Sequence, residues 1–157
     1  MNNLDRMIKL ADEVFAVKND PSQIAVDEEV MDRLRSIHPR SLNQKENGDG
    51  PVAWVLVFPT TRELMKQFLR KDIGERELLY RTPLGAQYDA LYLCSALVLP
   101  EFRRKGLARA LVLDAAHAIM KDHPIDSLFV WSFTAEGNRL AGKIAEELLL
   151  PLFERRS

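Results

Sequence analysis

The chain has 157 residues, of which 46% are hydrophobic and 29% are charged, and its formal net charge is −1 at pH 7. A chain of about 150 residues has room for one domain and buries roughly two-thirds of its unfolded surface, and this composition excludes a disordered or fibrous protein. The near-zero charge argues against nucleic acid or an anionic membrane as the main partner.

The single cysteine and the N-terminal residues bear on disulfides, metal sites and cellular location. Cys94 is the only cysteine, so there is no intramolecular disulfide framework and no cysteine-rich metal site. The first residues lack the charged and apolar regions of a signal peptide, and no apolar run approaches about 18 residues. We therefore expect a soluble cytoplasmic protein.

Two amphipathic helices are predicted in the first part of the chain. Apolar residues recur at helical spacing over residues 3–18, with charged residues on the opposite face. A second helix is predicted from Asp27, as its N-cap, to His38. Residues 39–51 are polar, contain two glycines and two prolines and have no period, so they are predicted to be a loop.

The middle of the chain begins with a buried strand. Residues 52–58 are a continuous apolar run of strand length, which predicts a central strand covered on both faces. Thr60 and Glu63 have the spacing of a capping box, so a helix is predicted over 61–71. Residues 74–81 favour a short helix over a weak strand, because glutamates disfavour strands, and the position of any strand within 72–90 stays open.

A strand, a basic turn and a helix follow. Leu91 to Leu99 is a nearly unbroken apolar run, and Pro100 ends it because proline has no N–H for a sheet neighbour. Three cations and Gly106 precede a predicted helix over 106–121. Beyond it the sequence predicts a buried strand over 127–134 and a helix over 136–150, ended by Pro151.

The basic turn suits a polyphosphate. The first turn of a helix has N–H groups without internal partners and carries about half a positive charge. Gly106 has no Cβ, so the backbone can approach a pyrophosphate closely, and Ala108 keeps that surface clear. Arginine and lysine side chains would add charge-assisted hydrogen bonds.

The segment from Val98 to Ala108 resembles the acyl-CoA-binding signature of the GNAT superfamily of N-acyltransferases, Arg/Gln-x-x-Gly-x-Gly/Ala preceded by Val-x-Pro. Arg103, Gly106 and Ala108 fall on its three defining positions. The resemblance covers residues 88–145 well and the rest loosely. It implies an α/β fold with a GNAT-like mixed central sheet of few strands, flanked by helices and preceded by a helical N-terminal region.

The chain departs from the family pattern at both ends. The family usually begins with a strand and finishes with two strands after the last helix, and neither feature is predicted here, so we expect a variant member without the usual first and last strands. We expect a single GNAT-like domain, with residues 1–50 as a helical substrate-side region and 51–157 as the acyl-CoA-binding core. A trimmed sheet would leave an edge for a second subunit, which makes a homodimer an expected partner.

The resemblance implies transfer of an acetyl or other acyl group from CoA to an amine by direct attack, with acetyl-CoA as co-substrate and no metal. The pantetheine arm would lie against the backbone between two diverging strands, and the pyrophosphate would sit on the amides of the basic turn. Arg103 and Lys105 would pair with phosphates, and Asn138 stands where the family often has an asparagine that contacts the cofactor. The implied cofactor-binding residues are Leu97, Val98, Leu99, Arg103, Arg104, Lys105, Gly106, Leu107, Ala108, Arg109 and Asn138.

The implied acid and base are not obvious. An amine of pKa about 10 must lose a proton before it attacks. Where many family members carry a glutamate base this chain has Tyr92, and where they often carry a tyrosine acid it has Ala145. Tyr92 is the candidate catalytic residue, with core packing as its alternative. Cys94 is read as an inert buried thiol rather than an acyl carrier, and the three histidines, which lack metal-ligand spacing, are expected to be solvated.

Two other functions stay open from the sequence. One is a degenerate acyl-CoA-binding or regulatory module, and the other is an unrelated α/β nucleotide-binding domain. For an active enzyme, the acceptor would be a small-molecule or protein amine, selected by residues 1–50.

Overall fold

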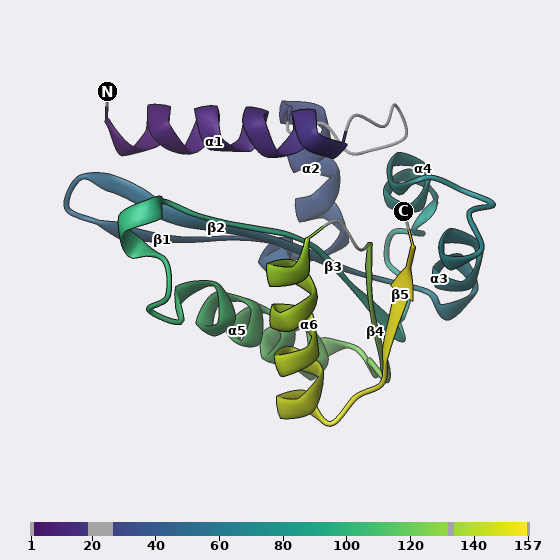
Figure 1. Cartoon of the computed structure of the whole chain (residues 1–157). Helices are drawn as coiled ribbons and strands as arrows, with labels where there is room; N and C mark the ends of the chain where they lie inside the picture. The colour runs from purple at the N-terminus through teal and green to yellow at the C-terminus, as the bar shows by residue number, and fades with distance from the viewer. Residues whose placement is uncertain (1, 19–26, 132–133, 157) are drawn as a thin grey trace.

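The computed structural model of the chain describes residues 2–18, 27–131 and 134–156 (Figure 1). Helices and strands come in pairs up to α4 and alternate from β3 onward. In order, the elements are α1 (Asn3–Lys18), α2 (Glu28–Ile37), the 3₁₀ turn η1 (Pro39–Ser41), β1 (Leu42–Asn47), β2 (Gly50–Thr60), α3 (Arg62–Leu69), α4 (Glu75–Arg81), β3 (Ala90–Val98), the 3₁₀ turn η2 (Pro100–Phe102), α5 (Leu107–Asp122), β4 (Ser127–Trp131), α6 (Ala135–Leu148) and β5 (Leu152–Arg155).

The five strands form one mixed sheet in the order β1-β2-β3-β4-β5. β1, β2 and β3 pair antiparallel, whereas β3, β4 and β5 pair parallel. Parallel neighbours need a crossover, and α5 and α6 supply the two that this sheet requires. The architecture is therefore the mixed α/β fold with a few-stranded sheet that the sequence predicts.

Helices cover both faces of the sheet. Figure 1 shows α1 along one side of β2 and β3, with α5 on the opposite side. A small core cluster joins Met7 and Ala11 of α1 to Val52 of β2, Leu97 of β3 and Leu99, which follows β3. A second, larger cluster lies elsewhere in the interior. Residues on both faces of β2 are buried, which explains the unbroken apolar run at 52–58.

The predicted helices at residues 3–18 and 27–38 are confirmed as α1 and α2, and the Asp27 side chain caps α2 by accepting from the Val30 N–H. The predicted loop at 39–51 is wrong, because β1 and the start of β2 form a hairpin there. β1 lies at the edge of the sheet with most of its side chains exposed. Its pairing depends on backbone hydrogen bonds to β2, so no apolar pattern marks it in the sequence.

The helices predicted at 61–71 and 74–81 are confirmed as α3 and α4, and residues 72–89 contain no strand. The predicted strand at 127–134 is β4, which ends at Trp131; residues 132 and 133 lie outside the described chain. Thr134 caps α6 by accepting from the Gly137 N–H, so it is a helix cap rather than a strand residue.

The expected absence of a strand after the last helix is also wrong. β5 pairs in parallel with β4 over four residues, from Leu152 to Arg155. So short a strand contains too few residues for an alternating pattern to be recognised in the sequence. At the other end, α1 and α2 precede the first strand of the described chain, as predicted. Within the described residues no helix has the length and apolar character needed to cross a membrane.

Candidate functional site

The neighbouring strands β3 and β4 pair along only part of their length. Their register runs from Ala90 to Leu93 of β3, and within the described residues β3 then continues to Val98 paired with β2 alone. The β2 register shifts at the same place, leaving Cys94 as an extra residue between Leu93 and Ser95. Such a bulge bends a strand and increases its twist, so β3 leaves β4 at Cys94.

The free edge of β3 presents main-chain polar groups. The Leu99 N–H donates to the Val52 carbonyl at 3.0 Å. Because the two polar groups of a trans peptide point in opposite directions, the Val98 carbonyl points away from β2, toward the open side. Arg103 Nε donates to this carbonyl at 3.0 Å, so the arginine that follows the strand folds back onto its end.

A tight turn places the start of α5 next to this edge. Arg104 and Gly106 both have left-handed backbones, with φ of 63° and 77°, and a glycine adopts this conformation without strain. Gly106 is the N-cap of α5 and has no side chain to accept a hydrogen bond. In the described part of the chain, no acceptor meets the N–H groups of Leu107, Ala108 or Arg109. These amides are available to a ligand.

The space beside these amides is open. A Cβ added to Gly106 would meet no heavy atom within 4 Å, and Gly106 is exposed. Bare amides, the positive end of a 16-residue helix and free space together form an anion-binding arrangement. Binding of a pyrophosphate at this turn stays a prediction.

The cations of the turn differ in what they contact. Arg103, Arg104 and Lys105 are all exposed. The Lys105 ammonium lies 5.4 Å from the centre of the Phe102 ring, which holds it over the turn. Arg109 pairs with Glu147 of α6, so its guanidinium is engaged and its backbone N–H is the group that remains for an anion.

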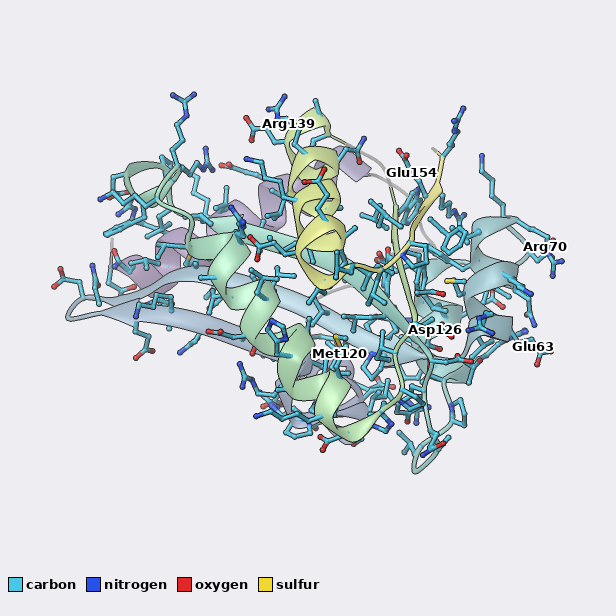
Figure 2. The ribbon with its side chains drawn as sticks, turned by 90° about the horizontal axis from the view of Figure 1, so that it is seen from below. Glu63, Arg70, Met120, Asp126, Arg139 and Glu154 are labelled. Carbon is cyan, nitrogen blue, oxygen red and sulfur yellow. The ribbon has the colours of Figure 1, made fainter. Side chains whose placement is uncertain are left out.

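Leu97 and Leu99 are almost fully buried against α1, whereas Val98 is half-buried on the other face of the strand. These residues therefore offer backbone rather than side chains to the open edge. Asn138 is exposed near the start of α6, and Figure 2 shows its neighbour Arg139 at the same end of that helix. α5 follows β3, whereas α6 follows β4. The basic turn and Asn138 therefore come after different strands of the diverging pair.

Tyr92 lies in the core. Its side chain has no exposure, and its ring contacts Phe58, Phe68 and Phe129. The hydroxyl donates to Oε2 of Glu75 at 2.5 Å. Burial, and then the nearby Glu75 charge, raise the Tyr92 pKa well above its ordinary value, which opposes formation of a tyrosinate base. These contacts favour the packing alternative for Tyr92.

Glu75 is the residue of this region that sequence reasoning missed. It is the first residue of α4, is completely buried, and also accepts from Cys94 Sγ at 3.7 Å. A signal for it exists in the sequence, because Glu75 shares one helical stripe with the buried Leu78 and Leu79. A carboxylate on an apolar stripe is unusual and needs partners inside the protein.

Arg155 of β5 is a buried cation beside the Phe68 ring, which also contacts the Tyr92 ring. Its guanidinium lies 4.5 Å from the Phe68 ring and 4.7 Å from the Trp131 ring. Nη1 also donates to the carbonyls of Phe68 and Ile73. These two hydrogen bonds fix the end of α3 and the segment that leads to α4. The positive charge of Arg155 opposes the effect of Glu75 on the Tyr92 pKa, so the three groups interact.

The expectation that all the histidines are solvated is wrong for His38 and His123. His38 is 5% exposed; its Nε2 donates to Asp122 at 2.7 Å, while its Nδ1 accepts from the Arg40 N–H. His123 is half-buried against the Tyr88 ring. The contact between η1 and the end of α5 is tertiary, so local sequence does not indicate it. Within the described residues, no group of three or more His, Cys, Asp or Glu could hold a metal ion.

Comparison with known proteins identifies a matching family and similar folds. The family model for the acetyltransferase (GNAT) family matches residues 7–148. An aminoglycoside acetyltransferase from an uncultured soil metagenomic sample, solved in complex with trehalose, is similar in fold with a TM-score of 0.50 and 13% identity, over 89% of this chain and 76% of that chain. Naa20 of Chaetomium thermophilum, in complex with a bisubstrate analogue, gives a TM-score of 0.51 and 14% identity, over 90% of this chain and 64% of that one. At these identities the likeness shows the fold alone, and no curated protein sequence gives a significant match.

Proposed function

The chain belongs to the acetyltransferase (GNAT) family, and from this premise we propose that it transfers an acetyl group from acetyl-CoA to an amine. The family assignment argues against the alternative of an unrelated nucleotide-binding domain. It leaves the acyl donor and the acceptor to be argued from the site.

One observation carries the proposal: bare amides at the start of α5 follow directly on the free edge of β3. The CoA pyrophosphate would accept from the N–H groups of residues 104–109, as a helix N-terminus favours. The pantetheine arm, which has amide groups of its own, would lie along Leu97, Val98 and Leu99. Gly106 and Ala108 leave room for the phosphates, and Arg104 and Lys105 supply exposed positive charge.

Arg103 has two tasks in this scheme. Its Nε holds the Val98 carbonyl, and its exposed guanidinium lies at the turn where the phosphates would bind. A planar guanidinium can serve a carbonyl and a phosphate with different N–H groups. Arg103 therefore links the two halves of the proposed cofactor site.

The transfer itself requires three events. The neutral amine attacks the thioester carbonyl carbon, the C–S bond breaks, and the nitrogen loses a proton to become an amide while the CoA thiolate takes up a proton. Backbone N–H groups near the divergence of β3 from β4 would stabilise the negative charge that develops on the carbonyl oxygen. The amine proton must leave before attack, because an ammonium has no lone pair.

A second candidate function, an acyl-CoA-binding or regulatory module without turnover, is favoured by one observation. Tyr92 and Ala145, which replace the usual base and acid, are both buried. Tyr92 is moreover engaged by Glu75. A protein that binds the cofactor but transfers nothing would fit these residues.

Turnover with a panel of amines separates the two functions. Release of CoA from acetyl-CoA would be followed with a thiol reagent in the presence of an aminoglycoside, a peptide with a free N-terminus, and a lysine peptide. Amine-dependent release, with the acetylated product found by mass spectrometry, supports the enzyme. Tight binding of acetyl-CoA without release by any amine supports the module, and absence of binding contradicts both.

A further inference from the structure

A buried carboxylate marks the place where β3 leaves β4. Glu75 accepts from the Tyr92 hydroxyl at 2.5 Å and from Cys94 Sγ at 3.7 Å. These two residues flank Leu93, which among the described residues is the last of β3 to pair with β4, and Cys94 is the extra residue of the bulge. One side chain from α4 therefore holds β3 on both sides of the point of divergence.

This arrangement is costly for a structural core. A carboxylate without solvent exposure gives up its hydration, and an apolar side chain of similar volume usually packs at lower cost. The network also draws in Arg155, a second buried ionic group, through rings it shares with Tyr92: Phe68 lies 5.2 Å from the Tyr92 ring and 4.5 Å from the guanidinium. Costly polar groups concentrated at one point of a fold often mark a functional site.

The network lies at the opposite end of the free edge from the phosphates. Among the described residues Leu93 is the last one of β3 that pairs with β4, whereas the bare amides follow the end of that strand at Val98. β3 itself contains no acidic residue. α3 and α4, which come between β2 and β3 in the chain, bring one to the bulge.

We propose that Glu75 is a positioning residue of the acyl-transfer site, fixing the Cys94 bulge through Tyr92 and Cys94 so that the β3 backbone meets the thioester in a productive place. This inference rests on the proposed transferase function. The phosphates that anchor CoA would bind after the end of β3, whereas Glu75 contacts the strand at the bulge. Glu75 would therefore affect the chemical step rather than the binding of CoA. Loss of the carboxylate should therefore change kcat far more than the affinity for CoA.

Two substitutions that keep side-chain shape test this role. Glu75→Gln removes the charge, and Tyr92→Phe removes the donor while keeping the ring. Each should lower kcat about ten- to hundredfold, the effect of a misplacement of order 1 Å. The dissociation constant for acetyl-CoA, measured by calorimetry, should stay within about twofold of the wild-type value.

The double variant tests whether Glu75 and Tyr92 act together. Two independent effects on the fold would add, whereas one shared effect on kcat would not. If Glu75 acts through Tyr92, the two changes should be non-additive, and the double variant should be no slower than the slower single variant. Glu63→Gln is the matched control, because Glu63 is an exposed carboxylate of α3 on the outside of the molecule (Figure 2). It should leave kcat unchanged.

The inference is overturned if both variants melt above the assay temperature and keep kcat within about twofold of the wild type. It is also overturned if kcat, CoA affinity and melting temperature fall together, which is the result of a purely structural role. Should Glu75→Gln not fold, Tyr92→Phe decides by the same criteria. Absence of turnover in the wild-type protein refutes the proposed function instead, so the two failures are distinguishable.

Discussion

Arg103 Nε donates to the main-chain carbonyl of Val98 at 3.0 Å and so joins the basic turn to the end of β3. The carbonyl belongs to the same peptide as the Leu99 N–H, which bonds to β2 on the other side. The contact therefore fixes the turn relative to the free edge of the strand. It also places the one arginine of the sequence signature between the two regions that the cofactor would occupy.

Arg103→Lys is expected to weaken acetyl-CoA binding about tenfold or more, the worth of one charge-assisted hydrogen bond. An ammonium keeps the charge but cannot serve a carbonyl and a phosphate in the fixed geometry of a guanidinium. Calorimetric titration measures the effect. Arg70→Lys is the control, because Arg70 is exposed and pairs with Asp72 on the outside of α3 (Figure 2). Equal affinities for the two variants would remove Arg103 from the site.

Gly106→Val is expected to lower acetyl-CoA affinity more strongly than it lowers stability. The left-handed backbone at φ 77° penalises a side chain by about 1–2 kcal/mol, and the added carbons would fill the space over the bare amides. Gly85→Val is the control with the same backbone strain. Gly85 has φ 72°, and an added Cβ there would also meet no atom within 4 Å. Both variants should lose similar stability in urea unfolding, while only Gly106→Val loses CoA binding. Similar CoA affinities for the two would contradict the pyrophosphate assignment.

The pair between Arg6 and Glu101 should make the junction of α1 with η2 sensitive to acid. Hydrogen bonds from Arg6, at 2.5 and 2.8 Å, are the main reason that the Glu101 pKa falls from 4.5 to about 2. The stabilisation from a carboxyl whose folded pKa is depressed is present above its unfolded pKa and is lost as the pH falls through the folded one. The contribution of the pair should therefore decline between about pH 4.5 and 2.

Arg6→Gln tests this dependence. Thermal unfolding of the variant and the wild type should differ most near neutral pH and converge toward about pH 2, as linkage requires. Arg35→Gln is the control. It removes an exposed ion pair with Asp32 within α2, which does not contact the basic turn. Added salt should also reduce the Arg6 effect, since both partners are partly exposed. A difference that stays constant across the acid range would contradict the assignment.

His123 should contribute a second pH dependence, in a milder range. Burial, followed by the charge of His38, lowers the His123 pKa from 6.5, whereas Asp122 opposes the shift. Nδ1 accepts from the Tyr88 N–H, so the neutral ring suits its surroundings. A histidine with a depressed folded pKa stabilises the fold fully above its unfolded pKa, and that contribution is lost as the pH falls below 6.5 toward the folded value.

His123→Asn should flatten this part of the stability profile. Urea unfolding at about pH 7.5 and at about pH 5.5 should show a larger loss for the wild type than for the variant. The variant is expected to be less stable at the higher pH, because it loses the ring contact with Tyr88. Identical losses in the two proteins would show that other groups carry the dependence.

Local patterns predicted most of the fold. The helices from α1 to α6 were readable because each presents an apolar stripe or a cap, and β2, β3 and β4 because buried strands are continuous apolar runs. β1 and β5 lie at the two edges of the sheet, where exposure and short length remove that pattern. β1 pairs with its neighbour in the sequence through a hairpin, whereas β5 pairs with β4 across the whole of α6, a contact that no local window contains.

The candidate site also has a part that the sequence predicts and a part that it does not. The turn at Arg103 and Gly106 is contiguous in sequence, and its chemistry follows from residue types at fixed spacing. The contact between Glu75 and Tyr92 spans 17 residues and joins α4 to β3 through a side-chain hydrogen bond. The apolar stripe of α4 marks Glu75 as a buried residue, but spacing along the chain does not encode its contact with the bulge of β3.

Calorimetric titration of the wild-type protein with acetyl-CoA, and with ATP in parallel, tests the central claim most directly. Both ligands carry an adenosine and phosphates, but only acetyl-CoA has a pantetheine arm to lie along the free edge of β3. The account predicts saturable binding of acetyl-CoA with clearly higher affinity than ATP. Equal or tighter binding of ATP, or no heat from acetyl-CoA, would contradict it.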